Sequence, residues 1–384
     1  MKKIAAFVTA LVIFTVLLVS IHILAIKTLP KGNRDFGYWI SSAKDSSYEL
    51  LAQNIGPKTQ LYMGSSEFHH GLKTQYNPSN LFRQTDLDVM CLGAAFNQCL
   101  THAITVGAVG PKLENKKVCL ILSPTWFYSH RSALAGREFL LRYSSTCYFK
   151  AMHNDQLSEA TRDAIKTRKE HLLNSSGNDD SFKKLQGAIG KEKDRAKTVL
   201  MWTVRRRHSV EVDPSVEEGG NGHNLENTEN PGNVKVLDFG ILMKDAEIDT
   251  GKRHNPYNMK DKIFNRKFKG KLSKMKNKNA NLSFDESDEY GDLQIFIDVC
   301  KDQGLDVELI LQPMNGKWYD YTGLTADKRH VVSKKVKEIA DKNGVKLCDL
   351  TNEEYTEGFF EDAVHPAQKG WVIINEKAYN FFNS

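Results

Sequence analysis

Short apolar runs alternate with longer segments of helical periodicity over much of the chain. The apolar runs predict five buried strands, at residues 60–63, 86–92, 118–122, 306–311 and 345–348. The periodic segments predict helices at residues 96–109, 290–301, 326–343 and 367–382. This alternation is typical of parallel strands that are joined by helical crossovers. We therefore expect an α/β fold, in which helices cover both faces of a parallel sheet of about five strands.

The longest apolar stretch lies at the amino terminus. Met1-Lys2-Lys3 is followed by Ile4 to Ile26, which carry no formal charge when His22 is neutral. This stretch is long enough to span a bilayer. A signal peptide would have a shorter apolar core and a small-x-small cleavage site, whereas IKTLPKG follows here. The sequence predicts an uncleaved anchor over residues 1–27 and a folded domain over residues 28–384.

Two segments lie outside the strand-helix alternation. Residues 128–285 have a mostly helical pattern, which a Gly/Asn/Glu-rich linker interrupts around residues 212–233. We expect an insertion here that caps the carboxyl edge of the sheet and shapes a substrate site. Residues 35–55 predict one amphipathic helix, whose Tyr38-Trp39-Ile40 either lies at the membrane interface or packs on the domain.

The net charge of +6 hides a strong asymmetry along the chain. Residues 252–278 contain eleven Lys or Arg and a single acid, Asp261. The rest of the chain outside the anchor and its flanking lysines therefore has a net charge of about −7. Phe264 and Phe268 interleave with this charge, which suits contact with an anionic polymer or a membrane surface. A solvated basic face explains the same pattern equally well. Nucleic acid is a poor partner for a protein held outside the cell.

The cysteines and the paired histidines give little sign of a metal site. The six cysteines show no C-x-x-C spacing and no dense framework, and Cys119, Cys300 and Cys348 fall in apolar segments, where buried thiols are expected. His69 and His70 are adjacent, so on a helix their side chains point in different directions and do not chelate one ion. We expect no metal and no cofactor.

Candidate chemistry lies at two short motifs far apart in the chain. In LYMGSSE, residues 61–67, an apolar strand enters a tight turn that presents Ser66 at the carboxyl edge of the sheet. In DAVHP, residues 362–366, Asp362 and His365 lie three residues apart. A serine hydroxyl becomes a nucleophile when an imidazole takes its proton, and a carboxylate fixes the tautomer of that imidazole. Either motif taken alone also fits an ordinary turn.

The order of these motifs resembles that of the SGNH/GDSL hydrolase superfamily. The resemblance implies an SGNH-hydrolase-like (flavodoxin-like) fold with Ser66, Asp362 and His365 as catalytic triad. It also implies an oxyanion hole that uses the N–H groups of Ser66 and Gly93, the small residue after the second strand; a packing role explains Gly93 as well. The sequence departs from the superfamily in two places. Ser65 stands where Asp is common, and VCLILSPTWF replaces the Gly-x-Asn-Asp block that carries the third oxyanion donor.

Further segments resemble the DltD family of D-alanyl-lipoteichoic acid biosynthesis in Gram-positive bacteria. They are GSSE at residues 64–67 and the longer segments 93–127, 287–324 and 361–371, which occur in the order of the family. The resemblance implies D-alanyl transfer to lipoteichoic acid through an acyl-serine on Ser66. It places a single-pass protein at the cell membrane with its catalytic domain outside. A D-alanyl carrier protein and an MBOAT-type membrane acyltransferase are the implied protein partners.

Three residues are candidate substrate contacts. Glu67, next to the nucleophile, is a candidate to recognise the D-alanyl ammonium group. Asn315 and Tyr319 belong to a polar and aromatic cluster just past the fourth predicted strand, where they line a pocket or pack a lid.

Two alternative functions use the same residues. The first is an esterase or thioesterase that hydrolyses D-alanyl groups, because water can replace a polymer hydroxyl as the acceptor. The second is a non-catalytic scaffold that recruits the carrier protein and the membrane acyltransferase.

Overall fold

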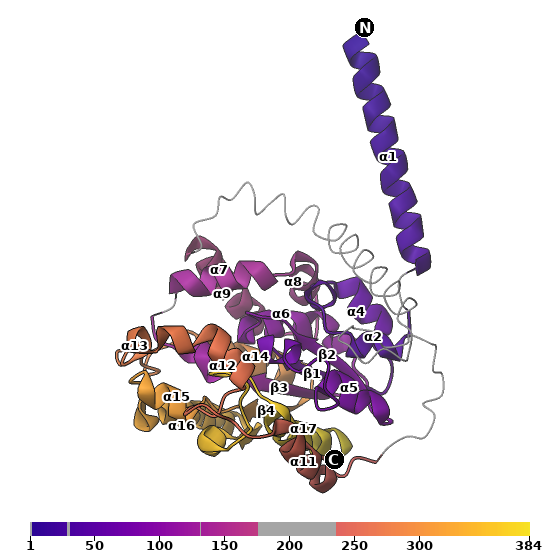
Figure 1. The fold of residues 1–384 in the computed structure, drawn as a ribbon. Helices are drawn as coiled ribbons and strands as arrows, with labels where there is room; N and C mark the ends of the chain where they lie inside the picture. The colour runs from indigo at the N-terminus through magenta and orange to yellow at the C-terminus, as the bar shows by residue number, and fades with distance from the viewer. Residues whose placement is uncertain (1, 29–30, 131, 176–235) are drawn as a thin grey trace.

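A sheet of five parallel strands forms the centre of the protein, which we describe from a computed structural model (Figure 1). The structure describes residues 2–28, 31–130, 132–175 and 236–384, so the linker expected around residues 212–233 lies outside it. The strands are β1 (Thr59–Gly64), β2 (Asp88–Gly93), β3 (Lys117–Leu122), β4 (Asp306–Leu311) and β5 (Lys346–Asp349). Their spatial order is β2-β1-β3-β4-β5, as in doubly wound flavodoxin-like sheets. The prediction of a five-stranded parallel sheet is confirmed.

The strand order determines where a ligand site is expected. The chain steps from β1 outward to the edge strand β2, and then returns to place β3 on the other side of β1. In open α/β sheets, ligands bind at the carboxyl ends of the strands where the order reverses in this way. The end of β1 lies at this position, and Ser66 follows it directly.

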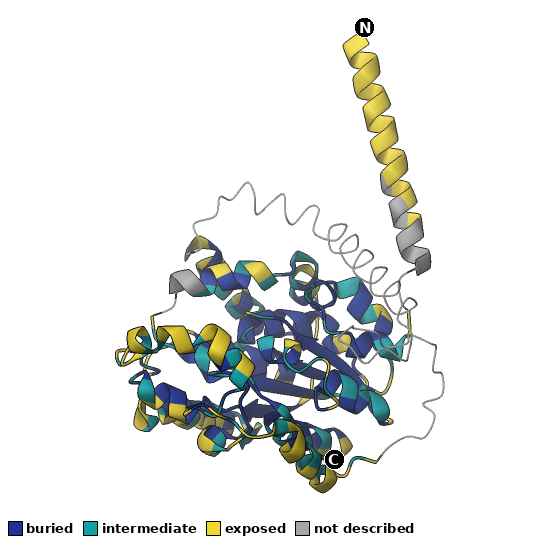
Figure 2. Ribbon diagram, viewed as in Figure 1, coloured by how far each residue is buried: buried dark blue, intermediate teal, exposed yellow. Residues whose placement is uncertain are grey.

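Two apolar clusters cover the two faces of the sheet. Alternate residues of each strand enter opposite clusters: Leu61 and Met63 of β1 belong to one, and Tyr62 belongs to the other. Because helices bury both faces, consecutive residues in the middle of β1 to β4 are apolar, which is the pattern that made these strands predictable. Figure 2 shows the buried residues concentrated in this centre.

Helices pack on both faces as predicted. One cluster includes residues of α6 (Cys99–Val109), α14 (Glu289–Asp302) and α16 (Ala326–Asn343), and the other includes residues of α5 (Pro78–Leu81), α11 (Phe239–Thr250) and α17 (Gln368–Asn383). The observed bounds of α14, α16 and α17 lie within one residue of the prediction. The helix predicted from residue 96 begins only at Cys99, because Phe96 has a φ of 74°, in the left-handed region that a helix excludes.

The described part of the predicted insertion is mostly helical. Between β3 and α14 it contains α7 (Ser132–Arg142), α8 (Ser145–Met152), α9 (Glu159–Ser175), α11, α12 (Asp261–Lys267) and α13 (Leu272–Met275). Short 3₁₀ turns join the core elements: η1 (Ser66–His69), η2 (Phe82–Gln84), η3 (Gly110–Lys112), η4 (Pro124–Phe127), η5 (Lys269–Lys271) and η6 (Thr351–Tyr355). A further short helix, α15 (Gly316–Tyr321), follows β4.

The single helix predicted for residues 35–55 is wrong. The segment forms three short helices, α2 (Arg34–Tyr38), α3 (Ser42–Asp45) and α4 (Tyr48–Asn54). Asn33 and Ser41 cap the amino ends of α2 and α3 with their side-chain oxygens, which starts each helix anew. Tyr38 and Trp39 are buried in the domain.

The same segment covers the edge strand β2. The buried ammonium of Lys44 donates to the carbonyl oxygens of Gly37 (2.8 Å) and Cys91 (2.6 Å), which ties α2 and α3 to the strand. The Arg34 guanidinium donates to the carbonyl oxygens of Thr85 and Leu87, just before β2 begins. A covered edge is protected from pairing with a strand of another chain.

Helix α1 (Lys2–Thr28) extends away from the rest of the protein (Figure 1). Figure 2 shows it exposed along most of its length. Large apolar residues such as Ile4 and Phe7 are among the exposed ones. Within the described residues, we find no helix that meets both the length and the apolarity required of a membrane span. The anchor at residues 1–27 stays a prediction.

All six cysteines are free thiols. Cys119 and Cys300 are buried as predicted, whereas Cys348 is only partly buried. Burial raises the pKa of Cys91 to about 12 and that of Cys348 to about 11, so both are uncharged near neutral pH. An uncharged thiol is a weak nucleophile.

We predict that Gly93→Ala lowers the free energy of unfolding by about 1–3 kcal/mol. A Cβ atom at Gly93 would lie 2.5 Å from the buried ring of Phe68, which has no free space to move. Gly291 in α14 is the matched control, because a Cβ atom there meets nothing within 4 Å. Gly291→Ala should be neutral or stabilise by about 0.5–1 kcal/mol. Urea unfolding of both variants tests the contrast, and equal effects would contradict it.

Candidate active site

Close packing at the end of β1 fixes the position of Ser66. Gly64 and Gly93 are paired in register at the ends of β1 and β2. A Cβ atom on either glycine would come within 2.5 Å of the Phe68 ring. The absence of side chains at these two positions therefore lets η1 fold back onto the sheet. Phe68 is fully buried and packs edge-on against Tyr62 and Trp371.

Hydrogen bonds brace the backbone just before Ser66. The buried carboxylate of Glu67 accepts from the Ser65 N–H, and the Ser65 hydroxyl donates to the carbonyl oxygen of Ala94 (3.2 Å). His102 Nε2 lies 2.8 Å from the Gly64 carbonyl oxygen. Burial lowers the pKa of His102 to about 4, so the ring is neutral and its Nε2–H donates this bond.

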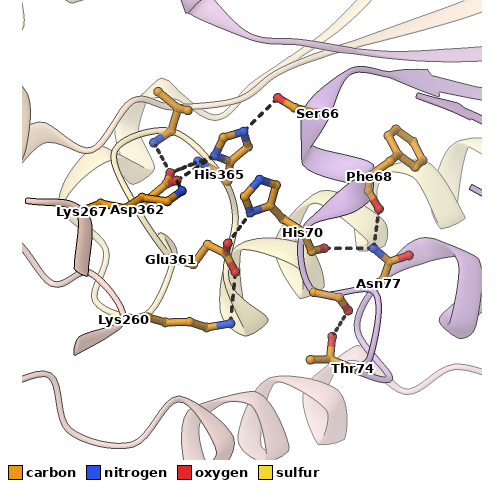
Figure 3. Close-up of polar contacts among 12 residues, drawn as sticks. Ser66, Phe68, His70, Thr74, Asn77, Lys260, Lys267, Glu361, Asp362 and His365 are labelled. Atoms are coloured by element: carbon orange, nitrogen blue, oxygen red, sulfur yellow. Dashed lines mark hydrogen bonds and ion pairs between the residues drawn. The ribbon is translucent and has the colours of Figure 1, made fainter. Parts of the chain in front are cut away.

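The structure brings the three predicted catalytic side chains together (Figure 3). Ser66 Oγ lies 2.9 Å from Nε2 of His365. Nδ1 of the same ring lies 2.9 and 3.0 Å from the two carboxylate oxygens of Asp362. Because a carboxylate accepts, the ring proton belongs on Nδ1, which leaves Nε2 free to accept from the serine hydroxyl. This is the arrangement of a nucleophile, its base and the acid that orients the base.

Local hydrogen bonds shape the loop that carries Asp362 and His365. Oδ1 of Asp362 accepts the N–H groups of Val364 (3.1 Å) and His365 (3.0 Å), which closes a tight turn around the side chain. An isolated bridge between Phe360 and Pro366 closes the base of the loop. The spacing Asp-x-x-His thus folds locally into a unit in which acid and imidazole already meet.

The charge distribution favours an ionised Asp362. Burial alone would raise the pKa of Asp362, but the His365 ring and two backbone N–H groups hold it well below its usual range. Burial would likewise lower the pKa of His365, but the bond to Asp362 and the negative charges of Glu67 and Glu361 raise it above the ordinary value. The imidazole therefore holds a proton more strongly than a free histidine, as a general base requires.

Gly93 lies level with Gly64, at the same edge of the sheet as Ser66. Its contact with Phe68 explains why a glycine stands there without reference to catalysis. Its N–H also faces the buried carboxylate of Asp45, whose pKa burial raises to about 6. An oxyanion would compete with this carboxylate for the Gly93 N–H. The oxyanion role of Ser66 and Gly93 stays a prediction.

The three predicted substrate contacts are engaged within the protein. Glu67 is buried and bonded to the Ser65 N–H. Asn315 is buried, and its amide donates to the carbonyl oxygens of Tyr257 (2.9 Å) and Asp362 (3.3 Å), so it supports the loop of the base. Tyr319 is buried with its hydroxyl 3.4 Å from that of Tyr128. Contact of these three residues with a substrate stays a prediction.

The basic segment, residues 252–278, borders the candidate site. Lys267 Nζ lies 3.7 Å from the Asp362 carboxylate, and Lys260 Nζ lies 3.2 Å from that of Glu361. Phe264 is buried and Phe268 packs on the Trp318 ring with centroids 4.8 Å apart, so these aromatics anchor the segment inward. The sequence predicts the positive charge of this segment, but the position of the segment beside Asp362 depends on tertiary packing.

His70 and Glu361 are also neighbours of the site, which the sequence does not predict. From the sequence, His70 is of interest only as a partner of His69 for a metal ion. Instead, His69 is exposed, while the His70 ring stacks on His365 and its Nδ1 contacts the Glu361 carboxylate. The one available signal was the position of Glu361 directly before Asp362.

Comparisons with known proteins identify the family. The model of the DltD protein family matches residues 34–383. The chain is 29% identical to Protein DltD of Bacillus subtilis (strain 168) over 336 residues, which cover 84% of this chain and 81% of the relative. It is 24% identical to Protein DltD of Staphylococcus aureus (strain NCTC 8325 / PS 47), over 82% of this chain and 78% of the relative. With Protein DltD of Lacticaseibacillus rhamnosus, identity is 22%, over 88% and 79%. The family match covers most of the chain, which therefore belongs to the DltD family.

Proposed function

We propose that the protein is a serine acyltransferase that passes D-alanyl groups through Ser66 to lipoteichoic acid at the outer face of the membrane. The observation that carries the proposal is the hydrogen-bonded chain Ser66–His365–Asp362. Membership of the DltD family implies a part in the D-alanylation of teichoic acids. The uncharged stretch at residues 4–26 supports an anchor that holds the domain at the membrane.

The reaction proceeds in two steps. His365 Nε2 takes the proton of Ser66, whose oxygen attacks the carbonyl carbon of a D-alanyl ester or thioester. The leaving group departs with the proton from His365, and the D-alanyl group remains on Ser66. A hydroxyl of the polymer then gives its proton to His365 and attacks the acyl carbon. Ser66 leaves with that proton, and the product is a D-alanyl ester.

The basic segment supports a polyanionic acceptor. Its lysines at positions 262, 267, 269, 271, 274, 276 and 278 are exposed, whereas the apolar residues between them face the core. Such a face attracts a chain of phosphate groups and raises the local concentration of its hydroxyls. Since Lys267 lies within 4 Å of Asp362, a polymer bound along the segment would pass close to the acyl-serine.

Ser66→Ala should abolish labelling by a serine-directed fluorophosphonate. Intact mass of the full chain in detergent is the measurement, with a single adduct expected on the wild type. Ser65→Ala is the matched control and should keep the adduct, because the Ser65 hydroxyl donates to Ala94 and does not face His365. In cells, Ser66→Ala should remove D-alanyl ester from lipoteichoic acid. Full retention of the ester would favour the scaffold alternative.

The rate of labelling should rise with pH, with a midpoint above the ordinary histidine pKa of about 6.5. Only neutral His365 can accept the serine proton, and its pKa is raised by Asp362. Asp362→Asn should move the midpoint to lower pH and slow labelling by up to about 10⁴-fold. His330→Gln is a control, because His330 forms a similar imidazole-carboxylate pair, with Glu354 in place of Asp362. A midpoint that Asp362→Asn leaves unmoved would argue against this role of Asp362.

Charge reversal in the basic segment should weaken binding of lipoteichoic acid. We expect Lys269→Glu, Lys271→Glu and Lys274→Glu together to cost at least about tenfold in affinity at low salt, with a smaller loss at high salt. The control reverses the exposed Lys334, Lys337 and Lys342 of α16, which changes the net charge equally. Equal losses in both triple variants would indicate a general charge effect and no dedicated surface.

The product of the wild-type reaction separates transfer from hydrolysis. A transferase releases D-alanine mainly as polymer ester, whereas an esterase or thioesterase releases it as free D-alanine even when polymer is present.

A further inference from the structure

A second imidazole lies flat against that of His365. The ring centroids of His70 and His365 are 3.7 Å apart, and their planes are within 10° of parallel. Nδ1 of His70 contacts the Glu361 carboxylate, just as Nδ1 of His365 contacts Asp362. Figure 3 shows two imidazole-carboxylate pairs side by side, with acids that are adjacent in sequence.

Both members of the second pair are held firmly. The His70 N–H donates to the Glu67 carbonyl oxygen (2.8 Å), and the His70 carbonyl oxygen accepts from Asn77 Nδ2 (3.0 Å) and Trp371 Nε1 (3.1 Å). The Glu361 N–H donates to the His365 carbonyl oxygen (2.9 Å). Because its backbone is fixed at these points, the His70 ring is a rigid wall for His365.

The geometry argues against a metal ion in this cluster. Ligand atoms of His70, Asp362 and His365 lie within 4.8 Å of one another, which is close enough for coordination. However, the lone pairs of an imidazole lie in the plane of its ring, and two parallel planes do not direct their lone pairs to one point. Nδ1 of His365 and the Asp362 carboxylate are also bonded to each other.

The stacked ring affects the positive charge that forms on His365 during the reaction. When His365 takes the serine proton it becomes a cation, and the face of a neutral ring favours a cation beside it. A second imidazolium at 3.7 Å would instead repel it. Lys260 Nζ lies 3.2 Å from the Glu361 carboxylate, so a cation also faces the acid that holds the His70 ring.

Other charged groups also face the stack. From η1 these are Glu67 and the neighbouring His69, and from the loop of the base, Asp362. Lys267 of α12 lies against Asp362, and Arg253 lies near Glu361. Lys260 is the cation in direct contact with the carboxylate that pairs with His70, so it is the informative one to remove.

We propose that His70, supported by Glu361 and Lys260, is a positioning residue whose flat ring aligns the His365 ring with Ser66. The inference rests on the proposed function, because it concerns the base that activates Ser66. The segment just after Ser66 thus has a second role, because its His70 ring packs against the imidazole of the base.

The first test is the rate at which fluorophosphonate labels Ser66 in the full chain. His70→Ala removes the wall and should slow labelling by on the order of 10²-fold, since small misplacements of a reacting group cost that much. His70→Phe keeps a flat neutral ring and should retain most of the rate at neutral pH. His330→Gln is the matched control, because His330 forms a half-exposed imidazole-carboxylate pair with Glu354 instead, and it should match the wild type.

The second test is the pH profile of the same rate. Lys260→Met leaves the charge of Glu361 without its counterion, so it should favour protonation of His365 and move the acid limb to higher pH. A role in folding alone would not move the limb.

Several outcomes would overturn the inference. These are a wild-type labelling rate in His70→Ala, a His70→Phe variant as slow as His70→Ala, and an acid limb that Lys260→Met leaves in place. If His70→Ala does not fold, His70→Phe and Lys260→Met carry the test. A wild-type chain that is never labelled, although folded, would instead remove the proposed function and this inference with it.

Discussion

The packing of the Phe68 ring on two glycines is the constraint on which the candidate site depends. Gly64 and Gly93 end neighbouring strands at the same level. Because neither has a side chain, they leave the space that the Phe68 ring occupies. That ring anchors η1, and η1 carries both Ser66 and the segment that leads to His70. The packing at the end of the sheet thereby fixes the orientation of the Ser66 hydroxyl toward His365.

Acidic and basic side chains alternate over short distances at the site. Asp362 and Glu361 each hold an imidazole, and Lys267 and Lys260 of the basic segment face the same two acids. Pairs that are partly buried in this way are screened less by salt than surface charges are. The basic segment thus has two roles in the structure: Lys260 and Lys267 contribute positive charge beside the two acids, and its exposed lysines, Lys267 among them, form a cationic face.

Much of this arrangement could be predicted from local patterns. Buried strands are apolar on both faces, and the turn Asp-x-x-His closes on itself, so β4, α16 and the pair Asp362–His365 could be read from short stretches. Other features depend on contacts between distant segments. The stack of His70 on His365, the approach of Lys260 to Glu361 and the division of residues 35–55 into three helices all follow from tertiary packing, which local periodicity does not encode.

The separation of Ser66 from its base along the chain has a consequence for synthesis. The two residues that share the hydrogen bond are 299 positions apart, and His365 lies within the last twenty residues of the chain. At a typical elongation rate of about 5–20 residues per second, roughly 15–60 seconds pass between them. The hydrogen-bonded chain Ser66–His365–Asp362 therefore forms only after nearly the whole chain has been made, and a chain truncated before residue 362 lacks it.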